Sequence, residues 1–385
     1  MSTHTPGKIG FAIIGCGVIA PMHQKAITAQ PDAELVAVMD VVPEIAEKRG
    51  AEFGVPFYSD LDALLARDDV QVVDVCVPSG LHAEIGIKAA LAGKHVICEK
   101  PIDISLDAAD RLTAACKEAG VKLQVISQHR FSNAMQQLKE AVEGGKLGRL
   151  VMGNASIFWY RAQAYYDSGG WRGTWDLDGG GALMNQGVHW VDQLRWIMGP
   201  VKSVSAKMGM LAHERIEVED AVAAVIEFEN GAIGSIIATT DAYPGYTTRL
   251  EIVGTEGSVI IEDAMIRAWN LKSEGGEIGA YGRSKEEKAA EAEKATVGAQ
   301  GAGAGDPAAI GWGGHAFQVR DMMNAIREDH ETANPGTEAR NPLELILGVY
   351  QSALTDKEVT FPVAADYHPG TQAAKLAKLT KGGTA

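Results

Sequence analysis

The sequence has few cysteines, and those present form no recognisable pattern. Its 385 residues include four, whose spacings fit neither a disulfide framework nor paired zinc ligands. Each lies in an apolar or helical context, so we expect reduced core thiols at Cys16, Cys76, Cys98 and Cys116. We assign no metal site.

The chain also lacks a long hydrophobic run and an excess of basic residues. No stretch approaches the roughly 18 apolar residues of a membrane span, and the opening MSTHTPGK does not resemble a signal peptide. Lys and Arg number 35 against 50 Asp and Glu, and the formal net charge of -15 repels nucleic acid and anionic membranes on average. We therefore expect a cytoplasmic protein that acts on a small molecule, with neither nucleic acid nor membrane as a partner.

What is present is an alternation of apolar runs and helical segments over residues 1–127. Strands are expected at IGFAII, ELVAVMD, QVVDVCV, HVICEK and KLQVIS, with a helix between successive strands. Such alternation predicts a parallel sheet covered by helices on both faces, which is an α/β domain. A chain that is 46% hydrophobic and 22% charged can bury the cores of two domains.

The pattern changes over residues 128–385, where strand-like runs are joined by turns. The runs AVAAVIEF and AIGSIIATT flank Asn230-Gly231, a typical hairpin turn. This predicts an α+β domain with an open, mainly antiparallel sheet. Residues 285–306, rich in Ala and Gly, are interpreted as a solvated excursion without a function.

The stretch IIGCGVIAPMHQ places a glycine-rich turn between the first strand and the first helix. Gly15 permits the tight turn, Gly17 lets the backbone approach a pyrophosphate, and the helix start offers amide donors. Asp40 ends the second strand about 20 residues further on, where an acid can bind the ribose of NAD and disfavour a 2'-phosphate. This Rossmann pattern predicts NAD contacts at Gly15, Cys16, Gly17, Val18, Ile19, Ala20 and Asp40.

Two further motifs, VPSGLHAEI and CEKP, follow strands of the same sheet at the ends where ligands of open α/β sheets bind. With its G-x-G-x-x-A turn, its E-K-P sequence and its antiparallel second domain, nearly the whole chain resembles the Gfo/Idh/MocA oxidoreductases. The resemblance implies that Lys100 hydrogen-bonds the reacting hydroxyl. It also implies that the remaining residues of these motifs surround the cofactor, which gives Pro78, Ser79, His82, Glu99, Lys100 and Pro101. From the segment SQHRF we add Gln128 as a further cofactor contact.

The second constellation is DLDGGGALMNQGVHWVDQL, which we interpret as a helix entered through three glycines. Helical spacing puts Asn185, His189 and Asp192 on one face, and the glycines are expected to admit a ligand close to the backbone. The resemblance makes His189 the general acid/base. Asn185 stands where relatives often carry aspartate, and an amide can orient a hydroxyl but cannot accept a proton.

These residues predict a dehydrogenase. His189 takes the proton of a sugar hydroxyl, Lys100 steadies the alkoxide, and a hydride moves to NAD. We expect oxidation to lose rate below a pKa near neutrality as His189 is protonated. The candidate substrate contacts are Lys100, Arg130, Tyr166, Trp171, Arg172, Asp178, Asn185, His189 and His315.

The substrate is expected to be a free monosaccharide or cyclitol, as in pentose dehydrogenases resembling that for D-apiose. A nucleotide diphosphate usually demands several basic residues. Alternatives are a UDP-sugar (N-acetylhexosamine or hexuronate) 3-dehydrogenase, a glycosidase that uses tightly held NAD, and an NAD-binding regulator without turnover. Relatives pair through the second sheet, which implies a homodimer or homotetramer. The charges counted near the substrate segments are Arg130, Arg161 and Arg172 among Asp167, Asp176 and Asp178.

Overall fold

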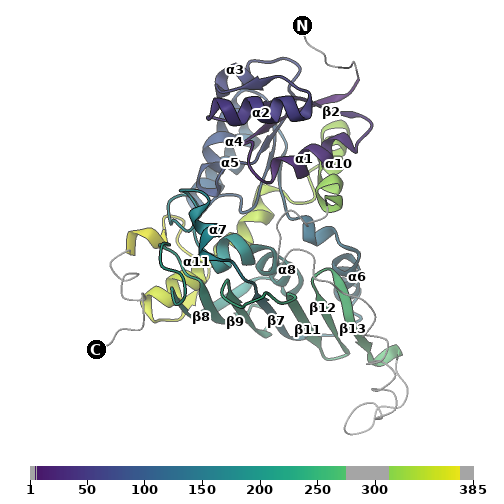
Figure 1. Ribbon diagram of the computed structural model, residues 1–385. Coiled ribbons are helices and arrows are strands. Elements are labelled where there is room, and N and C mark those ends of the chain that lie inside the picture. Colours follow the sequence, from purple (N-terminus) through teal and green to yellow (C-terminus); the bar gives the residue numbers. More distant parts are fainter. Residues whose placement is uncertain (1–4, 6, 275–311, 373–385) are drawn as a thin grey trace.

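The computed structural model describes residue 5, residues 7–274 and residues 312–372. It consists of a parallel-sheet part, at the top of Figure 1, and a second part built on a broad sheet below it. The predicted excursion at residues 285–306 lies outside the described residues. In the part of the chain that is described, no helix is both long and apolar enough to cross a membrane.

The first sheet has, within the described residues, six parallel strands in the order β3-β2-β1-β4-β5-β6. The chain builds outward from β1 in one direction and then from β4 in the other, so the strand order reverses between β1 and β4. Ligands of such sheets bind at the carboxyl ends beside this reversal. The strands are β1 (Ile9–Ile14), β2 (Ala33–Met39), β3 (Phe57–Tyr58), β4 (Val72–Val75), β5 (His95–Cys98) and β6 (Leu123–Val125).

Helices α1, α2, α4 and α5 of this part lie where the alternating pattern predicts them, and the short α3 and η1 were not predicted. Ser105 caps α5 by accepting a hydrogen bond from the Ala108 N–H, and Gly54 ends α2 in the left-handed conformation. The helices are α1 (Ala20–Thr28), α2 (Pro43–Phe53), α3 (Leu61–Leu65), the 3-10 turn η1 (Ser79–Leu81), α4 (His82–Leu91) and α5 (Leu106–Glu118).

The second sheet has eight strands within the described residues, in the order β13-β12-β11-β7-β10-β9-β8-β14. All neighbours are antiparallel except β7 and β10, which are parallel. The sequence did not predict β13 or the two-residue strand β14. The strands are β7 (Leu150–Phe158), β8 (Val201–Gly209), β9 (Ala221–Phe228), β10 (Ile233–Thr239), β11 (Arg249–Gly254), β12 (Gly257–Glu262), β13 (Met265–Leu271) and β14 (Val359–Thr360).

Among the residues that the structure describes, helices cover only one face of this sheet, with α8 packed on β7 and α11 on β8. Along β7 the residues alternate between buried and more exposed positions, as expected for a half-covered sheet. The helical segments are η2 (Gln128–Phe131), α6 (Asn133–Glu143), α7 (Gln163–Asp167), the π-helix η3 (Ala182–Gly187), α8 (Val188–Met198), η4 (Lys272–Glu274), α10 (Gly313–Glu328), α11 (Gly336–Thr355) and η6 (Pro369–Gln372).

One helix departs from the predicted division of the chain at residue 127. Although α10 comes late in the sequence, it packs against α1 beside the first sheet (Figure 1). Val319 and Met322 belong to the same buried cluster as Phe11 and Ile13 of β1. The late segment therefore completes the core of the first part, while α11 spans from α5 to β8.

Candidate active site

The glycine-rich turn between β1 and α1 has the geometry of a phosphate-binding loop. Gly15 has a φ of +95°, and a Cβ there would lie 2.5 Å from the Cys76 carbonyl oxygen, so only glycine fits. A Cβ on Gly17 would meet nothing within 4 Å, which leaves this side of the backbone open. No side chain caps the start of α1 at Ile19. Pro21 has no N–H and the Met22 N–H donates to the Ile19 carbonyl oxygen (2.9 Å), so the Ala20 N–H is the amide of the first turn that can face an anion.

Asp40 lies directly beside this loop. Its carboxylate accepts hydrogen bonds from the backbone N–H of Cys16 (2.9 Å) and of Val42 (3.0 Å). Sequence reasoning missed Arg49 of α2, whose guanidinium donates to the carbonyl oxygens of Cys16 (3.3 Å) and Gly17 (3.2 Å). A single arginine within a helix carries no motif, so only the fold brings it to the loop.

Glu99, which follows β5, points into the first part of the molecule. Its Oε1 accepts a hydrogen bond from His23 Nε2 (2.9 Å), and His23 Nδ1 donates to Asp74 Oδ2 (2.7 Å). Burial opposes the charge of His23, but Asp74 and Cys76 outweigh it and raise the pKa of His23 well above its usual value. Burial likewise opposes ionised Glu99, and His23 and His315 outweigh it and hold its pKa well below the usual range.

The adjacent Lys100 points the other way, toward the second part. Its backbone N–H donates to Glu99 Oε2 (3.1 Å), while its Nζ donates to the Asn185 carbonyl oxygen (3.3 Å). Burial lowers the pKa of Lys100, and the carboxylates of Glu99 and Asp178 oppose this shift. Two consecutive charges are thus divided between the two parts of the molecule.

His82 does not face the cleft as the resemblance implied. It is buried, with Nδ1 2.7 Å from the Pro101 carbonyl oxygen and Nε2 2.9 Å from that of Val77. Both ring nitrogens are therefore used to hold the turn that follows Lys100. Ser79 is buried at the start of η1, and Pro78 precedes it half-buried at the carboxyl end of the sheet.

The expected single helix over the second constellation is in fact a π-helix, η3, followed by α8. The side chain of Asn185 donates to Asp178 and accepts a hydrogen bond from Gln186 Nε2 (2.7 Å). The π-turn changes the angle between successive residues, so α-helical spacing does not describe the face shared by Asn185 and His189. Single π-turns of this kind recur at functional sites.

The glycine triplet serves protein packing, which corrects the expectation that it admits a ligand. A Cβ on Gly180 would lie 2.1 Å from Tyr350 Oη, and one on Gly181 would lie 2.0 Å from the Glu219 carbonyl oxygen. A Cβ on Gly179 would meet Ile104 at 2.3 Å. The glycines thus let neighbouring side chains and backbone approach the start of η3.

His189, in the first turn of α8, is 7% exposed. Its ring centroid lies 4.6 Å from that of His129, and neither of its ring nitrogens has a hydrogen-bond partner among the described residues. Burial lowers the pKa of His189 well below its usual value, and the nearby His129 and Lys100 add to the shift. The imidazole is therefore neutral at physiological pH and has a nitrogen free to accept a proton.

Three of the predicted substrate contacts are buried and bind other groups of the protein. Arg130 is buried and donates to both carboxylate oxygens of Asp192, at 2.8 and 2.5 Å, so its guanidinium is already engaged. The hydroxyl of Tyr166 is buried 3.0 Å from the Thr240 hydroxyl. His315 is fully buried, with Nε2 3.5 Å from Glu99 Oε1, and so belongs to the cluster around Glu99.

One side chain of η2 and one beside Glu99 have buried polar atoms without a partner. Among the described residues, Gln128 Oε1 and His315 Nδ1 have no hydrogen-bond partner although both are buried. Unpaired buried polar groups are costly and call for a ligand or water. A carboxamide such as that of nicotinamide both donates and accepts hydrogen bonds, and it fits this pair.

A hydrogen-bonded network extends from Asp178 to the edge of the second part. Gln186 Nε2 donates to Tyr165 Oη (2.9 Å), and Gln186 Oε1 accepts from Arg161 Nε (3.1 Å). Arg172 Nη1 donates to the same Tyr165 hydroxyl (2.7 Å), and its guanidinium also lies over the ring of Trp171. Sequence reasoning did not assign Tyr165 or Gln186 to the site, because neither belongs to a spaced motif.

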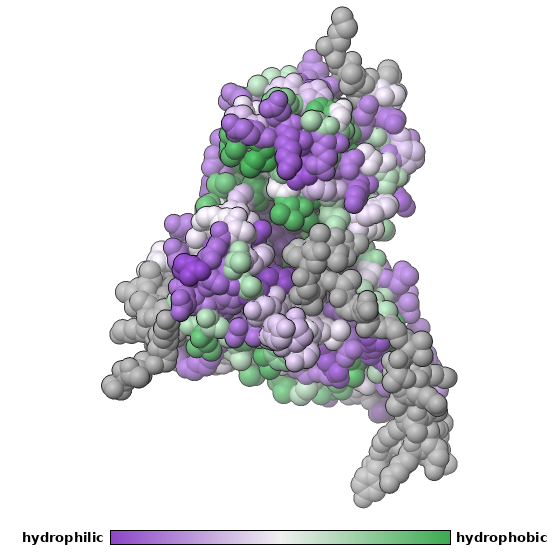
Figure 2. Space-filling view, in the orientation of Figure 1, coloured by the Kyte–Doolittle hydropathy of each residue, from purple (hydrophilic) through white to green (hydrophobic). Residues whose placement is uncertain are grey.

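Asp178 is buried at the centre of this network. Burial raises the pKa of its carboxyl to about 6, against the hydrogen bonds that it accepts from the Gly173 N–H (2.8 Å) and Asn185. With Lys100 and His189, it forms a set of one cation, one neutral base and one titrating acid. The space-filling view is hollowed between the two parts of the molecule (Figure 2). Such a set suits a ligand that carries hydroxyl groups.

Comparison with known proteins identifies the families of both parts of the chain. Residues 9–127 match a model described as an oxidoreductase family with an NAD-binding Rossmann fold, and residues 135–260 match the GFO/IDH/MocA C-terminal domain.

Individual relatives are dehydrogenases of sugars and inositols. Levoglucosan dehydrogenase of Pseudarthrobacter phenanthrenivorans is 30% identical over 66% of this chain and 73% of the relative. Myo-inositol 2-dehydrogenase of Thermotoga maritima is 31% identical over 70% of this chain and 80% of the relative. The solved structure of the WlbA dehydrogenase from Bordetella pertussis with NADH and UDP-GlcNAcA is similar at a TM-score of 0.78 and 34% identity, covering 93% of this chain and 100% of that one. The chain belongs to the Gfo/Idh/MocA family of oxidoreductases, with an NAD-binding Rossmann domain at its amino-terminal end.

Proposed function

We propose that the protein is a dehydrogenase that oxidises a secondary or anomeric hydroxyl of a sugar. The observation that carries this proposal is the neutral, unpaired imidazole of His189 beside the Lys100 ammonium, at the carboxyl end of a Rossmann sheet. A neutral base and a fixed cation are what the removal of a hydroxyl proton requires.

The cofactor NAD, when bound, supplies the hydride acceptor. The pyrophosphate has a binding site in the backbone around Gly17 and at the start of α1, and the ribose can reach Asp40. Gln128 and His315 offer the unpaired atoms for the nicotinamide amide. These contacts leave Lys100 and His189 to act on the substrate.

The reaction divides between two side chains of this protein. His189 accepts the proton of the substrate hydroxyl, which a positioned base accelerates by roughly 10² to 10⁴. Lys100 donates a hydrogen bond to the oxygen as negative charge develops there. Asn185 and Asp178 present an amide and a carboxylate that can orient neighbouring hydroxyls of the sugar.

Two classes of sugar remain as candidates. The relatives named for levoglucosan and myo-inositol favour a free sugar or cyclitol. The WlbA complex with UDP-GlcNAcA, which is 34% identical to this chain, favours a nucleotide-linked sugar. The site residues serve either class, because the hydroxyl chemistry is the same.

The test is a panel of aldoses, inositols and UDP-linked hexoses and hexuronates, with NAD reduction followed by the absorbance of the reduced cofactor. Turnover that is lost in both His189→Ala and Lys100→Met supports the proposal. Absence of turnover with every member of the panel, although NADH binds with ordinary affinity, contradicts it and favours the regulator. Release of a free sugar from a glycoside without net NAD reduction favours the glycosidase.

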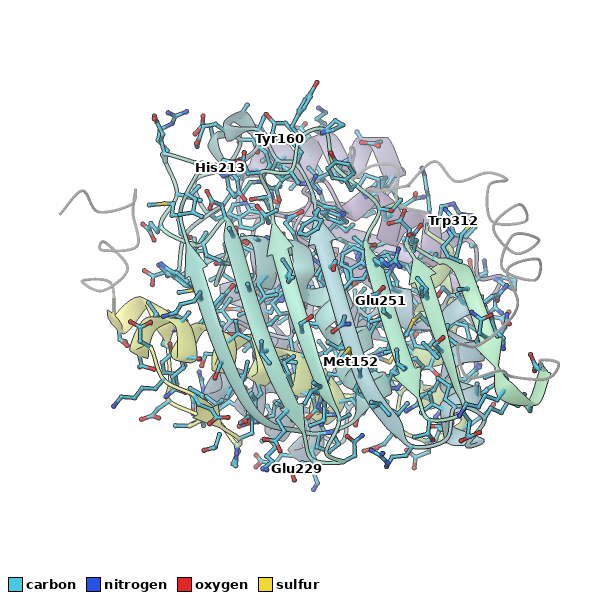
Figure 3. The ribbon with its side chains drawn as sticks, turned by 90° about the horizontal axis from the view of Figure 1, so that it is seen from below. Met152, Tyr160, His213, Glu229, Glu251 and Trp312 are labelled. Carbon is cyan, nitrogen blue, oxygen red and sulfur yellow. The ribbon has the colours of Figure 1, made fainter. Side chains whose placement is uncertain are left out.

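We further propose a homodimer or homotetramer formed through the uncovered face of the second sheet. Figure 3 looks onto this face and labels Met152 and Glu251 on its strands. Val225 is 61% exposed and Ile233 50% exposed on neighbouring strands, so large apolar side chains stand in solvent in the single chain. The four cysteines are buried and unpaired, which supports the proposal of a reducing cytoplasmic compartment.

A further inference from the structure

His129 is a second imidazole beside the proposed base. It lies in η2, and its ring centroid is 4.6 Å from that of His189 and 5.5 Å from that of Trp190. The two imidazole planes are tilted by 57° relative to each other. Sequence reasoning assigned the flanking residues Gln128 and Arg130 to the site but not His129, because only the fold brings η2 against the first turn of α8.

The ring nitrogens of His129 are not used within the described part of the chain. Neither nitrogen forms a hydrogen bond or an ion pair there, although the side chain is half-buried. A polar group that is withdrawn from water without a partner is unfavourable. Neither His129 nor His189 is among the residues whose unpaired polar atoms are fully enclosed, so a ligand can reach the nitrogens of both rings.

The charge state of His129 indicates which kind of group suits it. Burial lowers its pKa to about 4, and the nearby His315 and Lys100 lower it further. The imidazole is therefore neutral at physiological pH and has one N–H donor and one acceptor nitrogen. A hydroxyl group also donates and accepts, whereas a carboxylate only accepts and an ammonium only donates. The ring thus favours a hydroxyl as its partner.

We propose that His129 binds the substrate hydroxyl next to the one that is oxidised, so that the substrate is a vicinal diol. This inference rests on the proposed function and deepens it by naming a residue that determines specificity. His189 takes the proton of the first hydroxyl, and His129 exchanges hydrogen bonds with the second.

The contact between the two rings is what pairs the hydroxyls. Hydroxyls on adjacent carbons of a sugar ring lie beside each other, and two imidazoles with centroids 4.6 Å apart border the same small space. Lys100 lies close enough to both histidines that its charge lowers the pKa of each. An oxygen held between Lys100 and His189 therefore leaves the hydroxyl of the adjacent carbon beside His129.

The residues that flank His129 hold η2 in place. Arg130 donates to both carboxylate oxygens of Asp192 in α8, at 2.8 and 2.5 Å. Phe131 stacks on Phe317 of α10, with ring centroids 4.4 Å apart. Since η2 is fixed to two helices, the imidazole is positioned before the substrate arrives and little ordering is needed on binding.

The experiment measures the contribution of the second hydroxyl on the full-length protein with NAD. The pairs are glucose with 2-deoxyglucose, galactose with 2-deoxygalactose, and UDP-glucose with UDP-2-deoxyglucose, since C2 adjoins both C1 and C3. We expect kcat/KM of the wild type to be at least about tenfold higher for the hydroxylated member, because the deoxy analogue leaves the imidazole unpaired in the complex. A wild type that treats both members of each pair alike overturns the inference.

Variants assign this preference to the imidazole. His129→Phe keeps an aromatic ring against His189 and Trp190 but removes both nitrogens, so the preference should fall to about twofold or less through a loss with the hydroxylated sugar alone. His129→Gln, whose amide donates and accepts, should retain part of it. If His129→Phe does not fold, His129→Ala gives the same comparison, because the ratio within a pair cancels a uniform loss.

His330→Phe is the matched control, at a side chain that is 43% exposed and follows α10, and it should leave the preference unchanged. Equal losses with the hydroxylated and the deoxy sugar in His129→Phe would make His129 a packing residue and contradict the diol contact.

Binding to the NADH complex separates this inference from the proposed reaction. Glucose should bind the wild type at least about tenfold more tightly than 2-deoxyglucose, and His129→Phe should remove the difference. If this pattern is seen and no sugar is oxidised, the dehydrogenase proposal fails and the diol contact stands. If sugars are oxidised but their deoxy analogues serve equally well, the diol contact is refuted and the dehydrogenase stands. If no member of a pair binds or is oxidised, both are refuted.

Discussion

At the scale of single residues, Glu99 and Lys100 are neighbours with opposite tasks. Glu99 is held by His23 and lies in the core of the first part, whereas Lys100 reaches across to the Asn185 carbonyl oxygen. We predict that Lys100→Met lowers kcat by a factor of about 10² or more, because no other ammonium replaces it at the substrate oxygen. NADH affinity and melting temperature should stay close to wild type. If Lys100→Met retained most of the wild-type turnover, Lys100 would have no role in the chemical step.

The pH dependence is assigned differently from the sequence-based expectation. The pKa of His189 lies well below its usual value, mainly because the ring is buried, so its protonation does not produce a limb near neutrality. Two buried carboxyls beside η3 titrate in that range, Asp178 with a pKa of about 6 and Glu219 with a pKa of about 7, and of these Asp178 contacts the Asn185 side chain. Below a pH of about 6 the Asp178 carboxyl is protonated, loses an acceptor for Asn185 or the Gly173 N–H, and releases the Asn185 side chain.

We therefore predict that kcat/KM falls as the pH drops through about 6 and that Asp178→Asn removes this limb. The residual activity of His189→Ala should still show it. Profiles of kcat/KM against pH for the wild type and the two variants, with a stability check at each pH, measure this. If kcat/KM still falls at low pH in Asp178→Asn but no longer does so in His189→Ala, the group that titrates is His189.

Cofactor choice is also decided by single residues. Asp40 is fixed beside the glycine loop by the Cys16 and Val42 amides, and its negative charge repels a 2'-phosphate. We predict that kcat/KM with NAD exceeds that with NADP by at least about tenfold and that Asp40→Ala narrows the gap. Arg49 donates to the loop carbonyls and to Glu52, and its positive charge near the loop is the alternative influence that the comparison tests. If the wild type accepts both cofactors equally, Arg49 rather than Asp40 sets the local charge.

At the scale of elements, most strands of both sheets were predictable from the sequence, whereas β3, β13, β14 and the π-helix were not. The alternation of short apolar strands with helices predicted β1, β2, β4, β5 and β6, because parallel strands buried on both faces are short and uniformly apolar, but it did not predict the two-residue strand β3. The start of η3 depends instead on Glu219 and Tyr350, which are distant in the sequence. No local spacing reports such neighbours, so the glycine triplet was attributed to a ligand.

The start of η3 is held by one buried carboxylate. Glu219 accepts hydrogen bonds from the Gly181 N–H (2.9 Å), the Leu183 N–H (2.8 Å) and the Tyr350 hydroxyl (2.9 Å). The same hydroxyl accepts from the Met184 N–H (3.2 Å). These bonds position the segment that carries Asn185 into the site, so Glu219 and Tyr350 are positioning residues.

We predict that Glu219→Gln lowers kcat more than about tenfold with a smaller change in KM, because the new amide group faces a backbone N–H and displaces η3. Tyr350→Phe, which leaves the Met184 N–H without its acceptor, should cost about 1–3 kcal/mol of unfolding free energy. Steady-state kinetics and denaturant unfolding measure both effects. Wild-type kcat in Glu219→Gln would show that η3 holds its shape without the carboxylate.

The ionisation of Glu219 adds a check that a simple packing defect would not reproduce. Burial raises its pKa to about 7, above the usual 4.5, so the folded protein binds this proton more tightly than the unfolded chain. That stabilisation is complete at low pH and is lost as the pH rises through about 7. The stability difference between wild type and Glu219→Gln should therefore shift in favour of the variant across this range, in thermal melts at successive pH values.

At the scale of the whole molecule, the larger of two buried clusters contains residues of both parts, and the candidate site combines residues of both. The sequence indicated a boundary at residue 127, but α10 returns to pack on α1, and the site combines Lys100 from the first part with His189 from the second. Segments that lie far apart in the chain but close together in space cannot be recognised from a local sequence pattern. The places of the glycine-rich turn and of CEKP after their strands were predictable, whereas the engagement of Arg130, Tyr166 and His315 in the protein interior was not.

The uncovered sheet face carries the last prediction. Val225 and Ile237 project from adjacent strands, β9 and β10, and are 61% and 40% exposed, although the opposite face of each strand is buried. An apolar sheet face of this kind is stable in water only when another surface covers it, and a second copy of the same face does so by two-fold symmetry. Wild-type protein should therefore sediment as a dimer or tetramer.

A charge placed on that face should dissociate the assembly, since the same substitution meets itself across a two-fold axis. We expect Val225→Glu and Ile237→Lys each to shift sedimentation velocity toward the monomer at micromolar concentration with secondary structure unchanged. Leu91→Lys, at a position 76% exposed on α4 of the first part, is the matched control and should leave the assembly intact. A monomeric wild type, or variants that sediment as the wild type does, would show that the assembly does not use this face.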